Sequence, residues 1–466
     1  MNQATGHLYF IGIAGHAIRG LALAARELGY RVSGLDETAV PPGSDWLDQQ
    51  KIPWARAFSA AQLDDVKAVI VTGAHVSDDY PAIVEARRRG IPIKSYAQLL
   101  GELTAGEHVI AVAGTHGKTT TTSLIAWLLE AAGRHPDFLV GIRPFNFDSS
   151  VRLTGSKVAV VEGDEYKASN LETKSKVQYY HPDALVLTSV EHDHPDMYPD
   201  LDAVIQRFRE VVAAIPETGR LIAWAEHDTV TKVAAAANCS LITYGLESGD
   251  YTARDVAYLP SGIEFDVLRG HEVLGRVATA LYGEHNVLNG LAAVVACLGE
   301  GLSIGQIIKG AASFKGAYRR FNLITPADAP ITVVDDYAHH PSEAATNIEA
   351  AKLHFPGRRV VVVYRPHTYT RTAALLPEYQ RAFDQADLVY ITDIEGAREA
   401  GKTPNVSGND IVQALKMPAL YAPDRAELLR RLKVDARTGD VILCFTVSGY
   451  DNFAQELAKE LDSDTE

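Results

Sequence analysis

Residues 108–122 read HVIAVAGTHGKTTTT, an apolar run that ends in a glycine-rich turn. Residues 109–113 are apolar and partly β-branched, which predicts a buried strand, and residues 123–132 (SLIAWLLEAA) have the composition and spacing of a helix. The glycines let backbone N–H groups surround an anion at the positive end of that helix. The stretch therefore predicts a phosphate-binding turn between a strand and a helix.

The side chains of this turn indicate a nucleoside triphosphate. Lys118 supplies a positive charge for the outer phosphates, and the Thr119 hydroxyl can reach Mg²⁺. The standard pattern would need glycine at position 112, where this chain has Val112, so the turn is a shorter variant. A plain glycine turn with an exposed lysine is the alternative. We expect ATP or GTP to bind at Gly114, Thr115, His116, Gly117, Lys118, Thr119 and Thr120.

Length and composition describe an ordinary globular protein. The 466 residues allow about three domains. The net charge of −15 argues against nucleic acid and anionic membranes as partners. No apolar run approaches the roughly 20 residues of a membrane span, and the N-terminus lacks a secretory signal, so we expect a cytoplasmic protein. The cysteines match neither a disulfide framework nor a metal site, and we expect buried thiols at Cys239, Cys297 and Cys444.

A second glycine turn lies near the N-terminus. Residues 7–13 form an apolar run that leads into Gly12 and Gly15, then a helical stretch, a strand at 31–35 and Asp36. The spacing differs from the Gly-x-Gly-x-x-Gly fingerprint, which disfavours a dehydrogenase. We expect a nucleotide diphosphate at this helix N-terminus. Further strands and a helix follow, and residues 101–107 are interpreted as a linker.

Polar clusters follow two further strands. Residues 157–162 end in an acidic turn at Glu162, and residues 184–190 lead to a cluster that contains His194. The carboxyl ends of parallel strands meet at one edge of a sheet, so these side chains should approach the phosphate-binding turn. Carboxylate and imidazole beside a nucleotide suit Mg²⁺. An exposed polar turn or a zinc site remains open for the histidine cluster alone.

The last third carries several smaller signals. Asn286 and Asn289 lie near the first turn of an alanine-rich helix, where Asn286 alone would be a helix cap. Arg319 and Arg320 lie in a short basic segment, 315–322, interpreted as a second linker, and an arginine fork there could bind phosphate. Strands and helices then alternate, which predicts a third α/β domain with polar residues after the strand ends.

Taken in order, these motifs resemble the Mur ligase family over essentially the whole chain. The residues that carry the resemblance are Gly114-Thr115-His116-Gly117-Lys118-Thr119-Thr120, Glu162-x-Asp164-Glu165, Asp193-His194, His285-Asn286-x-x-Asn289, Arg319-Arg320-Phe321 and Asp335-Asp336-Tyr337-Ala338-His339-His340-Pro341. The resemblance implies an α/β protein of three domains: a Rossmann-like UDP-sugar-binding domain (1–105), a central P-loop ATPase domain with a mainly parallel sheet (106–318) and a Rossmann-like acceptor-binding domain (319–466).

The implied reaction is ATP-dependent amide synthesis in peptidoglycan metabolism, in which the carboxylate of UDP-N-acetylmuramate becomes an acyl phosphate that an amine attacks. Lys118, Glu162 and His194 would be catalytic, and Thr119, Glu162 and His194 would hold Mg²⁺. By position, the remaining roles fall to Gly12, Gly15, His16 and Asp36 for the UDP-sugar; His285, Asn286, Asn289, Arg320 and Asp336 for ATP; and His339, His340, Thr368 and Arg371 for the acceptor.

Two acceptors compete within the branch that acts on UDP-N-acetylmuramate directly. That branch is indicated because no lysine lies between His194 and Pro216 to supply the modified lysine of other branches. Residues 174–182 favour the tripeptide L-alanyl-γ-D-glutamyl-meso-diaminopimelate, whereas residues 365–372 favour L-alanine. Thr368 stands where L-alanine enzymes usually have arginine, and we therefore favour the tripeptide. Ser189 replaces a usual asparagine. A nucleotide-binding regulator is the alternative of another class, and we expect a monomer or homodimer.

Overall fold

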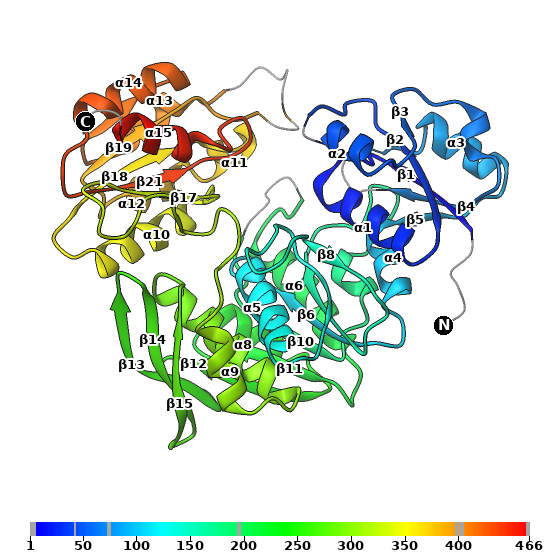
Figure 1. Cartoon of the computed structure of the whole chain (residues 1–466), viewed down its shortest axis with the longest axis horizontal. Helices are drawn as coiled ribbons and strands as arrows, with labels where there is room; N and C mark the ends of the chain where they lie inside the picture. The colour runs from blue at the N-terminus through cyan, green and yellow to red at the C-terminus, as the bar shows by residue number, and fades with distance from the viewer. Residues whose placement is uncertain are drawn as a thin grey trace. The chain divides into compact units, whose positions relative to one another are not determined.

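The computed structural model describes residues 6–41, 43–71, 76–192, 197–396, 399 and 405–462, and the side chains of His16 and Ala17 are not among them. Contacts divide the chain into two compact units. The first contains residues 1–191, 204–250 and 292–310, and the second contains residues 192–203, 251–291 and 311–466. Figure 1 shows the elements in the order of the chain.

The N-terminal part of the first unit is a five-stranded sheet, parallel throughout. Its strands, in spatial order, are β3 (Trp54–Ala55), β2 (Arg31–Leu35), β1 (His7–Ile11), β4 (Val66–Val71) and β5 (Ile93–Ser95). Its helices are α1 (His16–Glu27), α2 (Gly43–Gln49), α3 (Pro81–Arg88) and α4 (Tyr96–Leu103). The strand order changes direction between β1 and β4, as in a Rossmann-like sheet. The linker predicted at 101–107 is wrong in its first three residues, which belong to α4.

The first unit also contains the sheet that carries the phosphate-binding turn. Its strands, in spatial order, are β12 (Ser240–Gly245), β11 (Arg220–Trp224), β10 (Ala184–Leu187), β6 (His108–Ala113), β9 (Val158–Gly163), β7 (Asp137–Leu139) and β8 (Val151–Arg152). Only β8 runs antiparallel to its neighbour here. The strands β6, β9 and β10 are side by side, so their carboxyl ends share one edge, as the sequence predicted.

Residues 251–279 of the second unit form three antiparallel strands that the sequence analysis did not foresee. They are β13 (Tyr251–Leu259), β14 (Gly262–Arg269) and β15 (Glu272–Thr279), and consecutive strands pair with each other. Helix α8 (Glu284–Gly299) follows, and α9 (Ile304–Ala311) comes next along the chain. The apolar side chains of β14 are buried while much of β15 is exposed, so this meander has a core strand and an outer strand.

The C-terminal sheet of the second unit is also Rossmann-like. Its strands, in spatial order, are β16 (Asn322–Leu323), β17 (Thr332–Asp336), β21 (Asp440–Phe445), β18 (Arg359–Tyr364), β19 (Leu388–Ile391) and β20 (Ala419–Tyr421). Only β16 is antiparallel. One apolar core packs α10 (Pro341–His354) and α12 (Leu376–Ala382) on one face, and a second packs α14 (Arg425–Asp435) and α15 (Phe453–Asp462) on the other. The sheet is therefore covered on both faces, as a parallel sheet requires.

Two expectations drawn from composition can be compared with the structure. Among the helices of the described part of the chain, none is long and apolar enough to cross a membrane. All three cysteines are free thiols, and Cys297 and Cys444 are buried as expected. Cys239 is only half-buried, so the prediction of a buried thiol is wrong there, because this residue lies just before the exposed start of β12.

Candidate active site

The turn between β6 and α5 (Lys118–Ala131) has the shape that phosphate binding requires. Gly114 and Gly117 both have positive φ angles, +139° and +80°, which glycine adopts without strain. A Cβ at Gly114 would also collide with the Thr188 hydroxyl. Helix α5 begins at Lys118, five residues earlier than the sequence predicted. The first N–H groups of a helix have no acceptor within that helix. Because α5 begins directly after Gly117, these N–H groups lie in the glycine-rich segment, where they can bind an anion.

The two residues that directly follow β10, Thr188 and Ser189, hold the backbone of the turn by hydrogen bonds. The N–H group of Thr115 donates to the carbonyl of Ser189 (2.9 Å), and the N–H group of His116 donates to the Ser189 hydroxyl (2.9 Å). Thr188 donates from its hydroxyl to the carbonyl of His116 (2.5 Å). Ser189, which departs from the family pattern, thus supplies a polar side chain that supports the loop backbone.

Lys118 folds back over the turn. Its ammonium donates to the carbonyl of Gly114, to the carbonyl of Thr115 (3.0 Å) and to Oε2 of Glu165 (3.1 Å). Burial lowers the pKa of Lys118, but the nearby carboxylates of Glu165, Asp164 and Glu162 outweigh it, and the net shift of the pKa is upward. The lysine therefore stays charged inside the site.

Two of the three predicted metal ligands meet at this edge. The Thr119 hydroxyl donates to Oε1 of Glu162 (2.8 Å), and the backbone N–H of Gly141 donates to Oε2 of the same carboxylate (2.6 Å). A hydroxyl and a carboxylate are hard oxygen donors that fit Mg²⁺ with water completing its coordination. His194, the third predicted ligand, lies outside the described residues. The described residues contain no group of three or more His, Cys, Asp or Glu side chains that could hold a metal.

In the second unit, the two predicted asparagines form one buried pair. The Asn289 amide donates to Oδ1 of Asn286 (2.9 Å), and the Asn286 amide donates to the carbonyl of Tyr282 (2.8 Å). His285 is half-buried in the same first turn of α8. The pair fixes both amides relative to the helix start, so a rigid polar patch results.

Asp336 is the last residue of β17, and Arg319 and Arg320 lie just before β16. The Asp336 carboxylate accepts from the N–H groups of Phe321 and Ala338, each at 2.6 Å. Burial raises the pKa of Asp336 to about 6, although Arg320 opposes this rise. Arg319 is buried and bonds the hydroxyl of Thr446 (2.7 Å), which makes it structural. Arg320 is half-buried, so of the two arginines it is the better placed for a ligand.

The N-terminal turn uses Asp36 to order its own backbone. Gly12 has a φ of +77°, and its N–H donates to the carbonyl of Leu35 (2.7 Å). The Asp36 carboxylate accepts from the N–H of Ala14 (3.0 Å) and that of Thr38 (3.1 Å). Gly15 caps the N-terminus of α1. The side chain of His16, which the sequence analysis placed in this site, lies outside the described residues.

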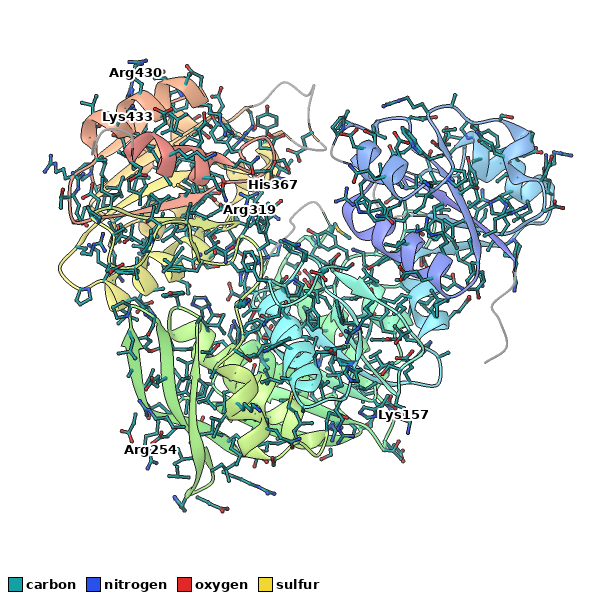
Figure 2. The ribbon with its side chains drawn as sticks, viewed as in Figure 1. Lys157, Arg254, Arg319, His367, Arg430 and Lys433 are labelled. Carbon is teal, nitrogen blue, oxygen red and sulfur yellow. The ribbon has the colours of Figure 1, made fainter. Side chains whose placement is uncertain are left out.

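The four predicted acceptor residues follow β17 and β18, two strands of the C-terminal sheet that are separated by β21. The ring of His339, after β17, lies 5.6 Å from the ring of His367, after β18. Figure 2 labels His367. His340 caps α10, since the N–H of Ser342 donates to its Nδ1 (3.2 Å). Thr368 and Arg371 are 2% and 4% exposed, so their roles are tied to the packing of this loop.

Two glutamates of the site were not assigned a role from the sequence. Glu399 accepts from the N–H groups of Tyr369 (2.7 Å) and Thr370 (3.0 Å), and so caps α11 (Tyr369–Ala374). Glu165 pairs with Lys118. Glu165 follows Glu162 by three residues in an acidic turn at a strand end, and that position was the available signal.

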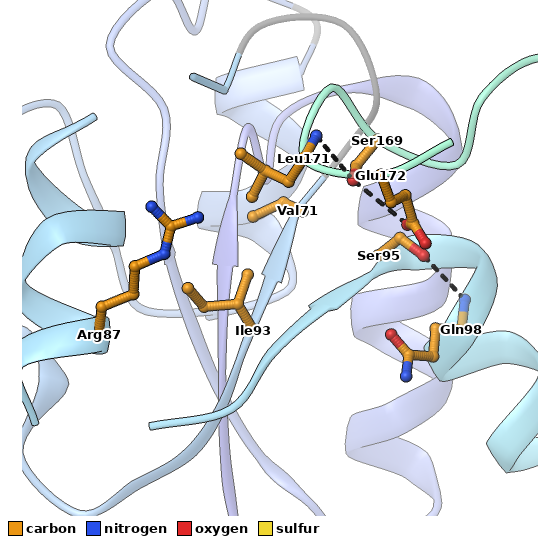
Figure 3. Close-up of a pocket in the computed structure, with 8 residues that line it drawn as sticks. All are labelled: Val71, Arg87, Ile93, Ser95, Gln98, Ser169, Leu171 and Glu172. Atoms are coloured by element: carbon orange, nitrogen blue, oxygen red, sulfur yellow. Dashed lines mark hydrogen bonds between the residues drawn. The ribbon is translucent and has the colours of Figure 1, made fainter. Parts of the chain in front are cut away.

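A cavity of 230 Å³ lies where the N-terminal sheet meets the loop after β9 (Figure 3). Its lining comes from β4, α3, β5 and α4 on one side and from that loop on the other: Val71, Arg87, Ile93, Ser95, Gln98, Ser169, Leu171 and Glu172. The loop continues from the acidic turn that contains Glu162 and Glu165. The loop that lines the cavity is therefore close in sequence to this acidic turn, and the lining includes one cation, Arg87, and one anion, Glu172.

Comparisons with known proteins agree along the whole chain. The family descriptions that match are Mur ligase family, catalytic domain (residues 7–108), Mur ligase middle domain (112–297) and Mur ligase, glutamate ligase domain (319–446). The UDP-N-acetylmuramate–L-alanine ligase of Acetivibrio thermocellus is 35% identical over 94% of this chain and 92% of its own.

Solved structures give the same result. The UDP-N-acetylmuramate-alanine ligase of Thermotoga maritima has a TM-score of 0.79 at 24% identity, with 98% of this chain and 100% of that chain covered. The murein peptide ligase of Psychrobacter arcticus has a TM-score of 0.71 at 27% identity, with 98% of each chain covered. The chain belongs to the Mur ligase family, and it is an ATP-dependent acid–amino acid ligase of peptidoglycan metabolism.

Proposed function

We propose that this chain joins the carboxylate of UDP-N-acetylmuramate to the amino group of L-alanine, with ATP as the activating co-substrate. One observation carries the chemistry: Lys118, Thr119 and Glu162 meet at the carboxyl ends of neighbouring strands. The acceptor is supported by the relatives named for L-alanine, which match this chain over 94% to 97% of its length. The sequence analysis favoured the tripeptide on local features, and the full-length relatives favour L-alanine instead.

The reaction needs charge neutralisation more than covalent chemistry. A carboxylate oxygen of the muramate attacks the γ-phosphorus of ATP, ADP leaves, and the acceptor amine then displaces inorganic phosphate from the acyl carbon. Lys118 and the N–H groups at the start of α5 would hold the phosphates in line. Thr119, Glu162 and His194 would hold Mg²⁺, which offsets negative charge on the transferred phosphoryl group.

The substrates are assigned to three regions, with boundaries proposed at 1–105, 106–318 and 319–466. The turn that contains Gly12, Gly15, His16 and Asp36 would take the UDP group. ATP would be completed by His285, Asn286 and Asn289 with Arg320 and Asp336. The acceptor would meet His339, His340, Thr368 and Arg371 at the edge of the C-terminal sheet.

The tripeptide L-alanyl-γ-D-glutamyl-meso-diaminopimelate is the second candidate acceptor. A ligase named for that peptide, from Neisseria meningitides, is 34% identical over 68% of this chain. The segment 174–182 also resembles that enzyme. The half-buried Arg365 lies in the loop after β18, stacks on Tyr450 at 4.3 Å and pairs with Glu395, so a polyanionic peptide would compete with Glu395 for this cation.

The decisive test compares the two acceptors on the full-length protein. ADP formation is measured with UDP-N-acetylmuramate, ATP and either L-alanine or the tripeptide. We expect kcat/KM for L-alanine to exceed that for the tripeptide by at least about tenfold. The reverse order would assign the tripeptide ligase. ADP formation with neither acceptor would refute both assignments, and Lys118→Ala supplies the background rate.

A further inference from the structure

Glu165 lies in the acidic turn after β9, and none of the roles proposed above uses it. Its Oε2 lies 3.1 Å from Nζ of Lys118, and the side chains are 5% and 14% exposed, respectively. The pair is therefore largely removed from solvent. Charges interact more strongly there than at the surface, because less water screens them.

The geometry of the ammonium group shows what a phosphate would have to replace. An ammonium has three N–H donors. In Lys118 these face the carbonyls of Gly114 and Thr115 and the Glu165 carboxylate. A phosphate oxygen that binds Lys118 must take one of these places. The carbonyls are neutral and can remain beside a phosphate, whereas a carboxylate repels it, so Glu165 is the partner that gives way.

We propose that Glu165 is a positioning residue that holds the Lys118 ammonium over the turn in the nucleotide-free protein and competes with the phosphates of ATP for it. Glu165 thereby keeps the lysine aimed at the site and weakens nucleotide binding at the same time. The proposal rests on the proposed nucleotide site at residues 114–120, and the experiment separates the two.

Asp164 provides a matched control on the same turn. Its Oδ2 lies 2.7 Å from Nζ of Lys176, so its charge already has a cation of its own. Asp164→Asn removes the same unit of charge one residue away and leaves the hydrogen bond between Lys118 and Glu165 in place. A general effect of charge would appear in both variants, whereas competition for Lys118 requires Glu165.

The experiment measures ATP affinity of the full-length protein by isothermal titration calorimetry in EDTA. The chelator removes Mg²⁺, so the measured affinity reflects ATP binding at residues 114–120 and does not depend on turnover. We expect Glu165→Gln to bind ATP about tenfold more tightly than the unchanged protein, because the phosphates no longer have to displace a carboxylate from Lys118. Asp164→Asn should stay within about twofold. Glu165→Asp, which keeps the charge on a shorter side chain, should tighten binding by only about threefold.

The outcomes separate this proposal from the proposed site. Equal or weaker ATP binding by Glu165→Gln or, should that variant not fold, by Glu165→Asp overturns the role of Glu165. Lys118→Ala should weaken ATP binding, and no change there would refute the nucleotide site itself. In a Lys118→Ala background Glu165→Gln should have no effect. Tightening that persists without the lysine would show plain repulsion and overturn the positioning role.

Discussion

The turns after β1 and β6 share one backbone plan but differ in chemistry. Each follows a buried parallel strand, contains glycine with positive φ and leads into a helix. After β6 the turn carries Lys118 and faces Glu162. After β1 the turn carries no lysine, and the carboxylate of Asp36 accepts from the N–H of Ala14. We therefore propose that similar backbone geometry serves phosphoryl transfer in one sheet and only substrate holding in the other.

The two turns also differ in which groups accept hydrogen bonds from their backbone N–H groups. In the turn after β6, the Ser189 carbonyl and hydroxyl take two loop N–H groups from outside, so the first turn of α5 is left for a ligand. In the turn after β1, the Asp36 carboxylate accepts from the N–H of Ala14, so one loop N–H is already bonded to a negative charge. A strand, a glycine turn and a helix are therefore insufficient evidence of catalysis, and the neighbouring strand ends decide.

The largest effect that this comparison predicts comes from Lys118→Ala. Acyl phosphate formation should fall by about 10³-fold or more, because the main fixed cation on the transferred phosphoryl group is lost. UDP-N-acetylmuramate affinity, measured by calorimetry, should change less than about twofold, since that substrate is assigned to the other turn. Equal loss of both would show that the two turns do not divide the substrates.

Glu162→Ala should have the next largest effect. The Thr119 hydroxyl would lose its partner and a proposed metal site would lose one oxygen ligand. Turnover should fall by about 10²-fold at low Mg²⁺ and recover in part as Mg²⁺ is raised, because phosphate oxygens and water can complete the coordination. A Mg²⁺-independent loss would mean that Glu162 acts only through the loop at Gly141.

The sequence predicted the strands that lead into the two glycine turns and the acidic turn, the two glycine turns themselves and the meeting of Thr119 with Glu162, because these depend on apolar periodicity and on the shared edge of parallel strands. It placed the start of α5 five residues too late. Threonines are poor helix formers, but here the hydroxyls of Thr122 and Ser123 bond the carbonyls of Lys118 and Thr119 one turn earlier, which lets the polar stretch stay helical.

Other features were not predicted. Some depend on contacts between residues that are distant in sequence, and for others a local signal was overlooked. The strands β13–β15 were missed, although Gly270 marks a two-residue hairpin loop between β14 and β15. His340 was assigned to the acceptor, yet the following Pro341 and Glu343 form the pattern of a helix N-terminus, and the structure shows His340 as the cap. Glu165 lies in the predicted acidic turn, but its contact with Lys118 spans 47 residues and could not be read from the local sequence.

Asp36→Ala tests the other member of the comparison. The turn after β1 should lose the carboxylate that orders its backbone at Ala14 and Thr38. We expect KM for UDP-N-acetylmuramate to rise about tenfold with kcat nearly unchanged, because two hydrogen bonds that shape a binding loop are lost and the reacting groups are untouched. A fall in kcat of similar size would extend the role of this turn beyond substrate holding.

The smallest expected effect concerns the N-terminal ends of β1 and β6. The titratable groups there, His7 and Glu107, change the stability of the fold in opposite directions as the pH changes. Burial, and then Arg31, lowers the pKa of His7 at the start of β1. The folded state therefore prefers neutral His7, and its contribution to stability is lost as pH falls below the unfolded value of 6.5. Burial, and then the carboxylate of Asp137, raises the pKa of Glu107, just before β6, to about 8.

The sign for Glu107 is the reverse of that for His7. Its unfolded value is 4.5, so between pH 4.5 and about 8 the folded state holds a proton that the unfolded state has released, and stability falls as pH rises through this window. Glu107→Gln should therefore raise the thermal midpoint by about 5 °C at pH 8.5 and by less than about 1 °C at pH 5. His7→Gln should raise the thermal midpoint only at pH 5, where the unchanged protein loses stability because His7 becomes protonated. Thermal unfolding of both variants at the two pH values provides the test, and a gain in Glu107→Gln that is equal at both would mean that packing, and not ionisation beside Asp137, limits stability there.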